Sequence, residues 1–179
     1  MKLTAQKIPD EFIRAIPRGF RLVQKQGDDF LLIESLFCPN GHNLIVESVR
    51  IHQEASIKLR IAIEGASGVI FVDAFWGSHA KLFSFIPRIS GSEPVFVEAQ
   101  CPYCDVRMME EYTCTQEGCK SDRSILLMLP GGKNKIHVCA RLGCPGHVLE
   151  ISDMPQKLIE SVNVINYFGA GPEDVFGEL

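Results

Sequence analysis

Seven cysteines in a chain of 179 residues limit the possible folds more than any other feature of this sequence. They fall into four short clusters, which also contain two of the five histidines. The clusters occupy residues 38–42, 101–104, 114–119 and 139–147. Cysteine and histidine side chains that converge from tight turns are the usual ligands of Zn²⁺ in proteins. The clusters therefore predict metal sites around which the chain folds.

Two short patterns recur among these clusters. Cys-Pro occurs at Cys38, Cys101 and Cys144, and Cys-x-x-x-Gly-Cys begins at Cys114 and again at Cys139. Residues at such spacings form a tight turn, in which two side chains point at one ion and backbone N–H groups point at the sulfurs. A glycine before the second cysteine of a pair permits the positive φ that such turns need.

Disulfides and a redox-active pair are the competing interpretations. The cysteine count is odd, and the first residues lack the apolar stretch of a secretory signal, so we expect a cytoplasmic protein with reduced thiols. A thioredoxin-like pair at Cys101 and Cys104 would lie between a strand and a helix, whereas another cysteine pair follows here. Both observations favour metal binding.

Nine candidate ligands supply two four-ligand sites, in either of two groupings. The first grouping, which we favour because it pairs like turns, places Cys38, His42, Cys101 and Cys104 on one ion and Cys114, Cys119, Cys139 and Cys144 on the other. The second grouping joins Cys101, Cys104, Cys114 and Cys119, and combines Cys38, His42 and Cys139 with either Cys144 or His147. We expect two zinc ions per chain. Iron also suits four thiolates, but the histidines in the turns favour zinc.

The turn Cys101-Pro102-Tyr103-Cys104 resembles the first knuckle of a zinc ribbon. The resemblance covers residues 101–147, together with the outlying turn at Cys38 and His42. The later cysteine pairs depart from the family pattern, because four residues rather than two separate their ligands. The resemblance implies a zinc-stabilised β-hairpin module. It implies no particular function, since zinc ribbons serve in several kinds of protein.

Outside the clusters the pattern is mostly β. Alternation over 57–63 and apolar runs at 30–33, 44–46 and 69–72 predict strands, as do segments 81–86, 94–99, 124–129 and 135–138. We expect turns at 65–68 and 130–134, a short helix after Pro9, and a C-terminal helix capped by Asp153. The prediction is an α+β, β-rich fold. In it, an antiparallel sheet is fused to a zinc-ribbon-like unit with a C-terminal helix.

The expected organisation has three segments. Residues 1–100 form the N-terminal helix and sheet with the Cys38 turn, residues 101–150 form the ribbon-like region, and residues 151–179 form the helix and an acidic tail. The net charge is −4, and residues 148–179 carry six acidic side chains and one basic side chain. No basic stripe for a phosphate backbone is present, and no apolar run reaches the ~18 residues of a membrane span.

The role that we expect is that of a non-enzymatic protein-interaction or accessory module with two structural zinc ions. Its partner would be another protein, which would dock on the acidic C-terminal segment. Two alternatives stay open. One is a sequence-selective nucleic-acid-binding ribbon that uses Lys133, Lys135 and Arg141. The other is an enzyme with one open zinc site, formed by His147 beside Glu150 or by His42 beside Glu47.

Residues 73–79 contain an aspartate, a serine and a histidine around the only tryptophan. A catalytic triad is disfavoured here, because triads assemble from distant segments. We expect Ser78 to be a turn residue and Trp76 to cover the sheet. Contact of Trp76 and His79 with a ligand or a partner stays open as an alternative that is favoured over catalysis. His52 continues the alternation of a strand, so it should face solvent. His137 should be structural.

Overall fold

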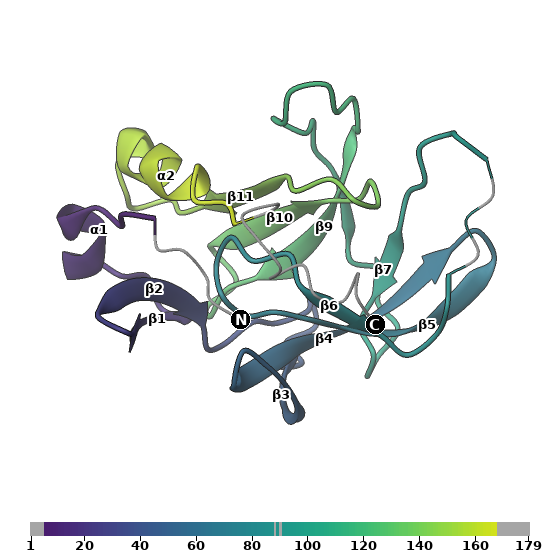
Figure 1. Cartoon of the computed structure of the whole chain (residues 1–179), viewed down its shortest axis with the longest axis horizontal. Coiled ribbons are helices and arrows are strands. Elements are labelled where there is room, and N and C mark those ends of the chain that lie inside the picture. Colours follow the sequence, from purple (N-terminus) through teal and green to yellow (C-terminus); the bar gives the residue numbers. More distant parts are fainter. Residues whose placement is uncertain (1–5, 88, 90, 168–179) are drawn as a thin grey trace.

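The computed structural model describes residues 6–87, 89 and 91–167 (Figure 1). This part of the chain is β-rich, with antiparallel strands in three sheets and one helix toward each end. The structure confirms the expected fold class: antiparallel sheets, a C-terminal helix and cysteine clusters compatible with a zinc-binding unit.

The chain begins with helix α1 (Asp10–Arg14), which follows Pro9 and buries Phe12 completely. A two-stranded hairpin of β1 (Phe20–Lys25) and β2 (Asp28–Ile33) comes next. The end of β2 was expected, but β1 was not. The alternation of β1 is weak: only Phe20, among its six residues, is fully buried.

Five strands form the first sheet: β3 (Ile45–Ile51), β4 (Glu54–Ile63), β5 (Ala66–Val72), β6 (Lys81–Phe83) and β7 (Glu98–Gln100). The order is β3-β4-β5-β6, and β7 also pairs with β4. The predicted alternation along β4 is confirmed: Ile57, Leu59, Ile61 and Ile63 are buried, whereas Ala62 is exposed. Both β6 and β7 are shorter than the segments predicted for them.

Two turns in this sheet differ from the prediction. Glu64 and Gly65, both with positive φ, make a two-residue turn, so β5 already begins at Ala66 and the turn expected over 65–68 is wrong beyond Gly65. His52 and Gln53 likewise have positive φ (52° and 71°) and join β3 to β4. Hairpin turns with both central residues in this region match the twist of the strands. His52 is therefore a turn residue and not part of a strand.

The second sheet contains β8 (Met109–Glu111), β9 (Arg123–Met128), β10 (Lys135–Cys139) and β11 (His147–Glu150), in the order β11-β10-β9-β8. The expected turn between β9 and β10 is confirmed, with positive φ at Gly131 and Gly132. Strand β8 has only three residues and was not predicted. Figure 1 shows this sheet beside the first one, with α1 and α2 at the same end of the molecule.

Helix α2 (Gln156–Asn163) buries Ile159 and Val162. The expected cap at Asp153 is wrong: Pro155 occupies the N-cap without a side-chain hydrogen bond, and the Asp153 carboxylate instead lies 3.0 Å from the Lys133 ammonium. Proline sets the helical φ itself and thereby moves the start of the helix beyond Asp153. The acidic tail and the stop expected at 169–172 lie outside the described residues.

One buried core contains residues from Ile8 to Tyr167 and joins both sheets to the hairpin. The backbone of Phe37, just before the first cysteine, exchanges two hydrogen bonds with Met128 on β9 (2.8 and 2.9 Å). The division of the chain into three segments remains a prediction. Among the described residues, neither helix has the length and apolar character needed to span a membrane.

Two candidate metal centres

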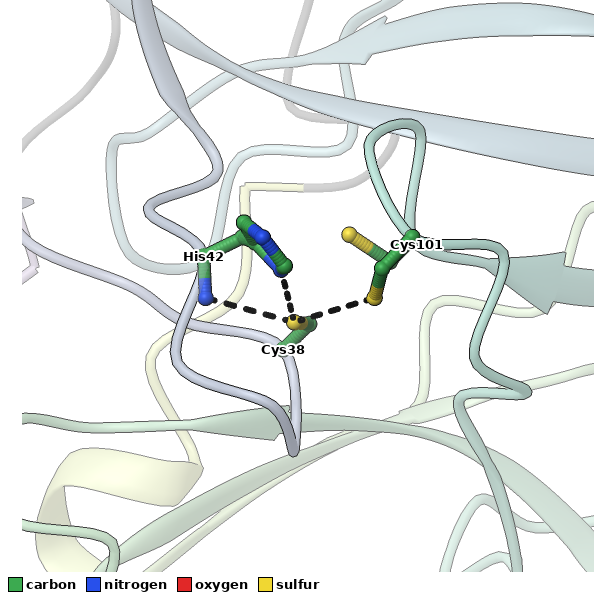
Figure 2. Close-up of side chains that lie close together, drawn as sticks. Cys38, His42 and Cys101 are labelled. Carbon is green, nitrogen blue, oxygen red and sulfur yellow. Dashed lines mark hydrogen bonds between the residues drawn. The ribbon is translucent and has the colours of Figure 1, made fainter.

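The first candidate centre contains Cys38, His42, Cys101 and Cys104, whose ligand atoms all lie within 4.8 Å of one another. Cys38 and His42 come from the loop between β2 and β3, and Cys101 and Cys104 from the turn after β7. Figure 2 shows Cys38 and His42 on one loop facing Cys101 on another. The centre thus joins two loops that are about 60 residues apart in the sequence.

Both loops of this first centre are tight turns. The Gly41 N–H donates to the Cys38 carbonyl (2.9 Å), and the Asp105 N–H donates to the Cys101 carbonyl (3.0 Å). Gly41 and Asp105 have positive φ (88° and 60°). Backbone N–H groups then point at sulfur: the His42 N–H lies 3.4 Å from Cys38 Sγ, and the Tyr103 N–H lies 3.4 Å from Cys101 Sγ. Such hydrogen bonds favour the thiolate, which is the form that binds metal.

The second candidate centre contains Cys114, Cys119, Cys139 and Cys144. The first two lie in the loop between β8 and β9, Cys139 ends β10, and Cys144 lies in the loop before β11. Each of the two loops contains a glycine with positive φ directly before a cysteine, Gly118 (78°) and Gly143 (84°). The predicted role of the Cys-x-x-x-Gly-Cys pattern in these turns is therefore confirmed.

The distances between ligand atoms match those expected around one ion. Four ligands about 2.3 Å from a tetrahedral ion lie about 3.8 Å apart. The sulfurs of Cys114 and Cys144 are 3.7 Å apart, as are those of Cys119 and Cys139. In the first centre the two sulfurs of Cys38 and Cys104 are 3.9 Å apart. These separations are far longer than the roughly 2.05 Å of a disulfide, and all seven cysteines are free thiols.

The thiols differ in their protonation. A hydrogen bond from the Val106 N–H lowers the pKa of Cys104 to about 7, whereas burial raises the pKa of Cys101. Burial also raises the pKa of Cys114 to about 11. A metal binds only the thiolate, so binding must displace protons from the buried thiols. The affinity of both centres for metal should therefore fall as the pH falls.

The two clusters have the membership of the first grouping and not of the second. His147, the alternative ligand, lies outside both. Its Nε2 is 2.8 Å from the Ile165 carbonyl and its Nδ1 is 3.1 Å from the Pro145 carbonyl. His147 is also packed edge-on against Trp76. His147 is therefore held by backbone carbonyls and by Trp76 and belongs to neither cluster of candidate ligands.

The pairs suggested for an open catalytic site are not formed. Glu150 lies three residues after His147 and so points to the opposite face of β11, where it is 3.3 Å from His137 Nε2. Glu47 is paired with Arg50 on the exposed surface. His137 is buried and stacks on Tyr112, in keeping with a structural role.

The segment after β5 forms a hydrogen-bonded turn without triad geometry. Ser78 Oγ donates to the Asp73 carboxylate (2.6 Å), and His79 Nε2 lies 3.0 Å from Asn166 Oδ1. The His52 ring is another partner of the Asp73 carboxylate. The expectation that His52 faces solvent is therefore wrong. Positive φ at His52 turns its side chain inward, a feature that periodicity could not reveal.

No protein-family model, curated protein or solved structure matches this chain. The chemistry of the two clusters therefore has to be argued from their own geometry.

Proposed function

We propose that this protein is a non-enzymatic interaction or accessory module, in which two structural zinc ions fix a surface that another protein recognises. The observation that carries the proposal is the closed ligand set of each centre. Four side chains surround each candidate position at the spacing of a tetrahedral ion, three thiolates with one imidazole in the first and four thiolates in the second. Catalytic zinc sites keep one position open for water, whereas structural sites do not.

The donor set supports zinc over iron. A site of three cysteines and one histidine is a common structural zinc arrangement, and a site of four cysteines is another. The second centre closes two loops at one end of an antiparallel sheet, which is the arrangement that a zinc-ribbon-like unit would have. We propose that the second centre is similar to a zinc ribbon in architecture, and we draw no function from this similarity.

Exposed apolar side chains supply a surface for a protein partner. Ile86 is 89% exposed and Ile89 is 51% exposed, both in the loop between β6 and β7. Tyr103 is 50% exposed and tilts against the ring of His42 in the first centre. Aromatic and aliphatic anchors of this kind are enriched in the centres of protein interfaces. The acidic C-terminal segment remains a second proposed contact.

Elemental analysis of the full chain, purified without chelator, tests the metal assignment. We expect two zinc ions per chain and no thiol that reacts before denaturation. The double variant Cys101→Ser/Cys104→Ser should retain one zinc, and so should Cys114→Ser/Cys119→Ser. Iron with visible absorption would overturn the zinc assignment. A single zinc in the unaltered chain would overturn the closed two-centre arrangement.

Affinity purification of the tagged full chain tests the binding role. A protein partner should copurify, and Ile86→Glu should reduce its recovery about tenfold or more, as expected for an interface anchor. The matched control is Ser48→Glu, since Ser48 is exposed on β3 and lies outside both this loop and the acidic C-terminal segment. Tight, salt-dependent retention on heparin with no bound protein would instead support the nucleic-acid alternative.

A further inference from the structure

A cavity lies between the two sheets, and none of the eight candidate metal ligands lines it. Its walls include Leu59 and Ile70 from the first sheet and Ile125, Leu127 and Ile136 from the second. Its volume is about 80 Å³, counted as the space open to the centre of a water molecule. One water needs about 10–15 Å³, so this space is several times larger than the voids that packed interiors usually contain.

The polar groups in the lining gather at one end and bond within the protein. The Asp73 carboxylate accepts hydrogen bonds from Ser78 Oγ (2.6 Å) and the Phe75 N–H (3.1 Å), and it also bonds His52. Trp76 Nε1 donates to the Val162 carbonyl (2.9 Å). These groups therefore do not require a ligand atom to replace a lost hydrogen bond.

The two histidines at this end are neutral at pH 7. Burial lowers the pKa of His79 to about 3, assisted by the neighbouring His147, and burial also lowers the pKa of His147. Lys81 is a partly exposed residue of the lining, and its ammonium donates to the His79 carbonyl (3.1 Å). The interior therefore presents branched aliphatic walls, the indole of Trp76 and neutral imidazole.

Water is a poor occupant of such a space. An internal water needs two to four polar partners, and aliphatic walls offer none. Replacing weakly held water by an apolar group is favourable, because apolar area leaves water and dispersion contacts are regained. A cavity with mostly apolar walls and a polar group at one end is also the usual form of a small-molecule site.

We propose that the cavity binds a small, predominantly apolar and uncharged organic molecule, held by the aliphatic walls and by contact with Trp76. The site is independent of which metal occupies the two centres. It would make the protein a carrier or sensor of such a molecule in addition to any interaction role.

Titration of the metal-loaded full chain with xenon, an uncharged apolar atom small enough for a space of about 80 Å³, tests this site. We expect saturable binding of one xenon atom per chain and quenching of the emission of Trp76, which is the only tryptophan. Binding that does not saturate, or that leaves the Trp76 emission unchanged, would contradict the proposal.

A cavity-filling variant locates the site. Leu127→Phe adds volume inside the cavity and should weaken xenon binding at least tenfold. Its matched control is Leu126→Phe, because Leu126 is the neighbouring residue on β9 and points to the opposite face. Metal content and the thermal midpoint of both variants show whether each has folded. In folded proteins, equal xenon affinity for the two variants would overturn the proposal, and so would loss of binding in the control alone.

Discussion

At the residue scale, the second centre depends on a glycine that is not a ligand. Gly146 donates its N–H to Cys144 Sγ (3.4 Å), and its carbonyl accepts from the Cys139 N–H (2.9 Å). A Cβ atom at this position would lie only 2.7 Å from Cys114 Sγ and 3.2 Å from Cys139 Cβ. No side chain fits there unless one of the sulfurs moves.

We therefore expect Gly146→Ala to weaken metal binding at the second centre by about 10–100-fold, as changes beside ligands commonly do, and to leave the first centre intact. Competition with a chromogenic zinc chelator, which resolves one weakened site per chain, measures this change.

The matched control is Gly68→Ala. There a Cβ would lie 2.4 Å from the Phe85 ring, in the first sheet and outside both metal centres. This variant should lower the thermal midpoint but keep both zinc affinities. If Gly146→Ala, like the control, lowers the thermal midpoint without changing either zinc affinity, then Gly146 contributes to packing alone.

At the scale of elements, the region of α2 is attached to the rest of the molecule by buried apolar side chains and by polar contacts. Trp76 Nε1 donates to the Val162 carbonyl (2.9 Å), and the Tyr167 N–H donates to the Gly77 carbonyl (2.9 Å). Gly77 has a positive φ of 87°, and a Cβ there would lie 2.7 Å from the Ile165 carbonyl oxygen. The turn after β5 and the end of the described chain therefore pack backbone against backbone.

Removing the indole donor should loosen this attachment. Trp76→Phe keeps most of the apolar contact but removes one of the two donors to the Val162 carbonyl, which retains the Ile165 N–H (3.1 Å). Loss of one such hydrogen bond costs about 0.5–1.5 kcal/mol. We expect the thermal midpoint of the metal-loaded protein to fall, with unchanged zinc content. Val164→Ala serves as the control, since that side chain is 74% exposed. Equal midpoints for Trp76→Phe and the control would mean that the hydrogen bond contributes little.

At the scale of the whole molecule, the two centres differ in what they connect. The first joins the loop after β2 to the turn after β7. It therefore links the N-terminal part of the chain to the segment that leads into the second sheet. The second joins loops within the β8–β11 sheet only. Metal binding contributes directly to folding where the ligands come from distant segments.

Hydrogen exchange should reveal this difference. In Cys101→Ser we expect faster amide exchange in both sheets, because the connection between them is weakened. In Cys119→Ser the increase should be confined to the loops at 112–123 and 139–147. Mass spectrometry of the exchanged, proteolysed chain maps the two patterns. Identical patterns in the two variants would mean that either metal supports the whole fold equally.

The sequence by itself determined the types of the candidate ligands, the tight turns and the β-rich class. Cysteine spacing and glycine position are local properties, and alternation reports directly on a half-buried strand such as β4. It also suggested the grouping of ligands that the structure brings together. It missed β1 and β8, whose short or weakly alternating segments become strands only because a neighbour pairs with them.

Only the tertiary structure decided the environments of the histidines and the cavity. His52 reaches Asp73 because both residues of its turn adopt positive φ, and His147 turns into the core because β11 presents that face inward. The space between the sheets depends on how two inner faces meet. Facing residues such as Ile70 and Leu127 are more than 50 positions apart, and no local pattern specifies the distance between them.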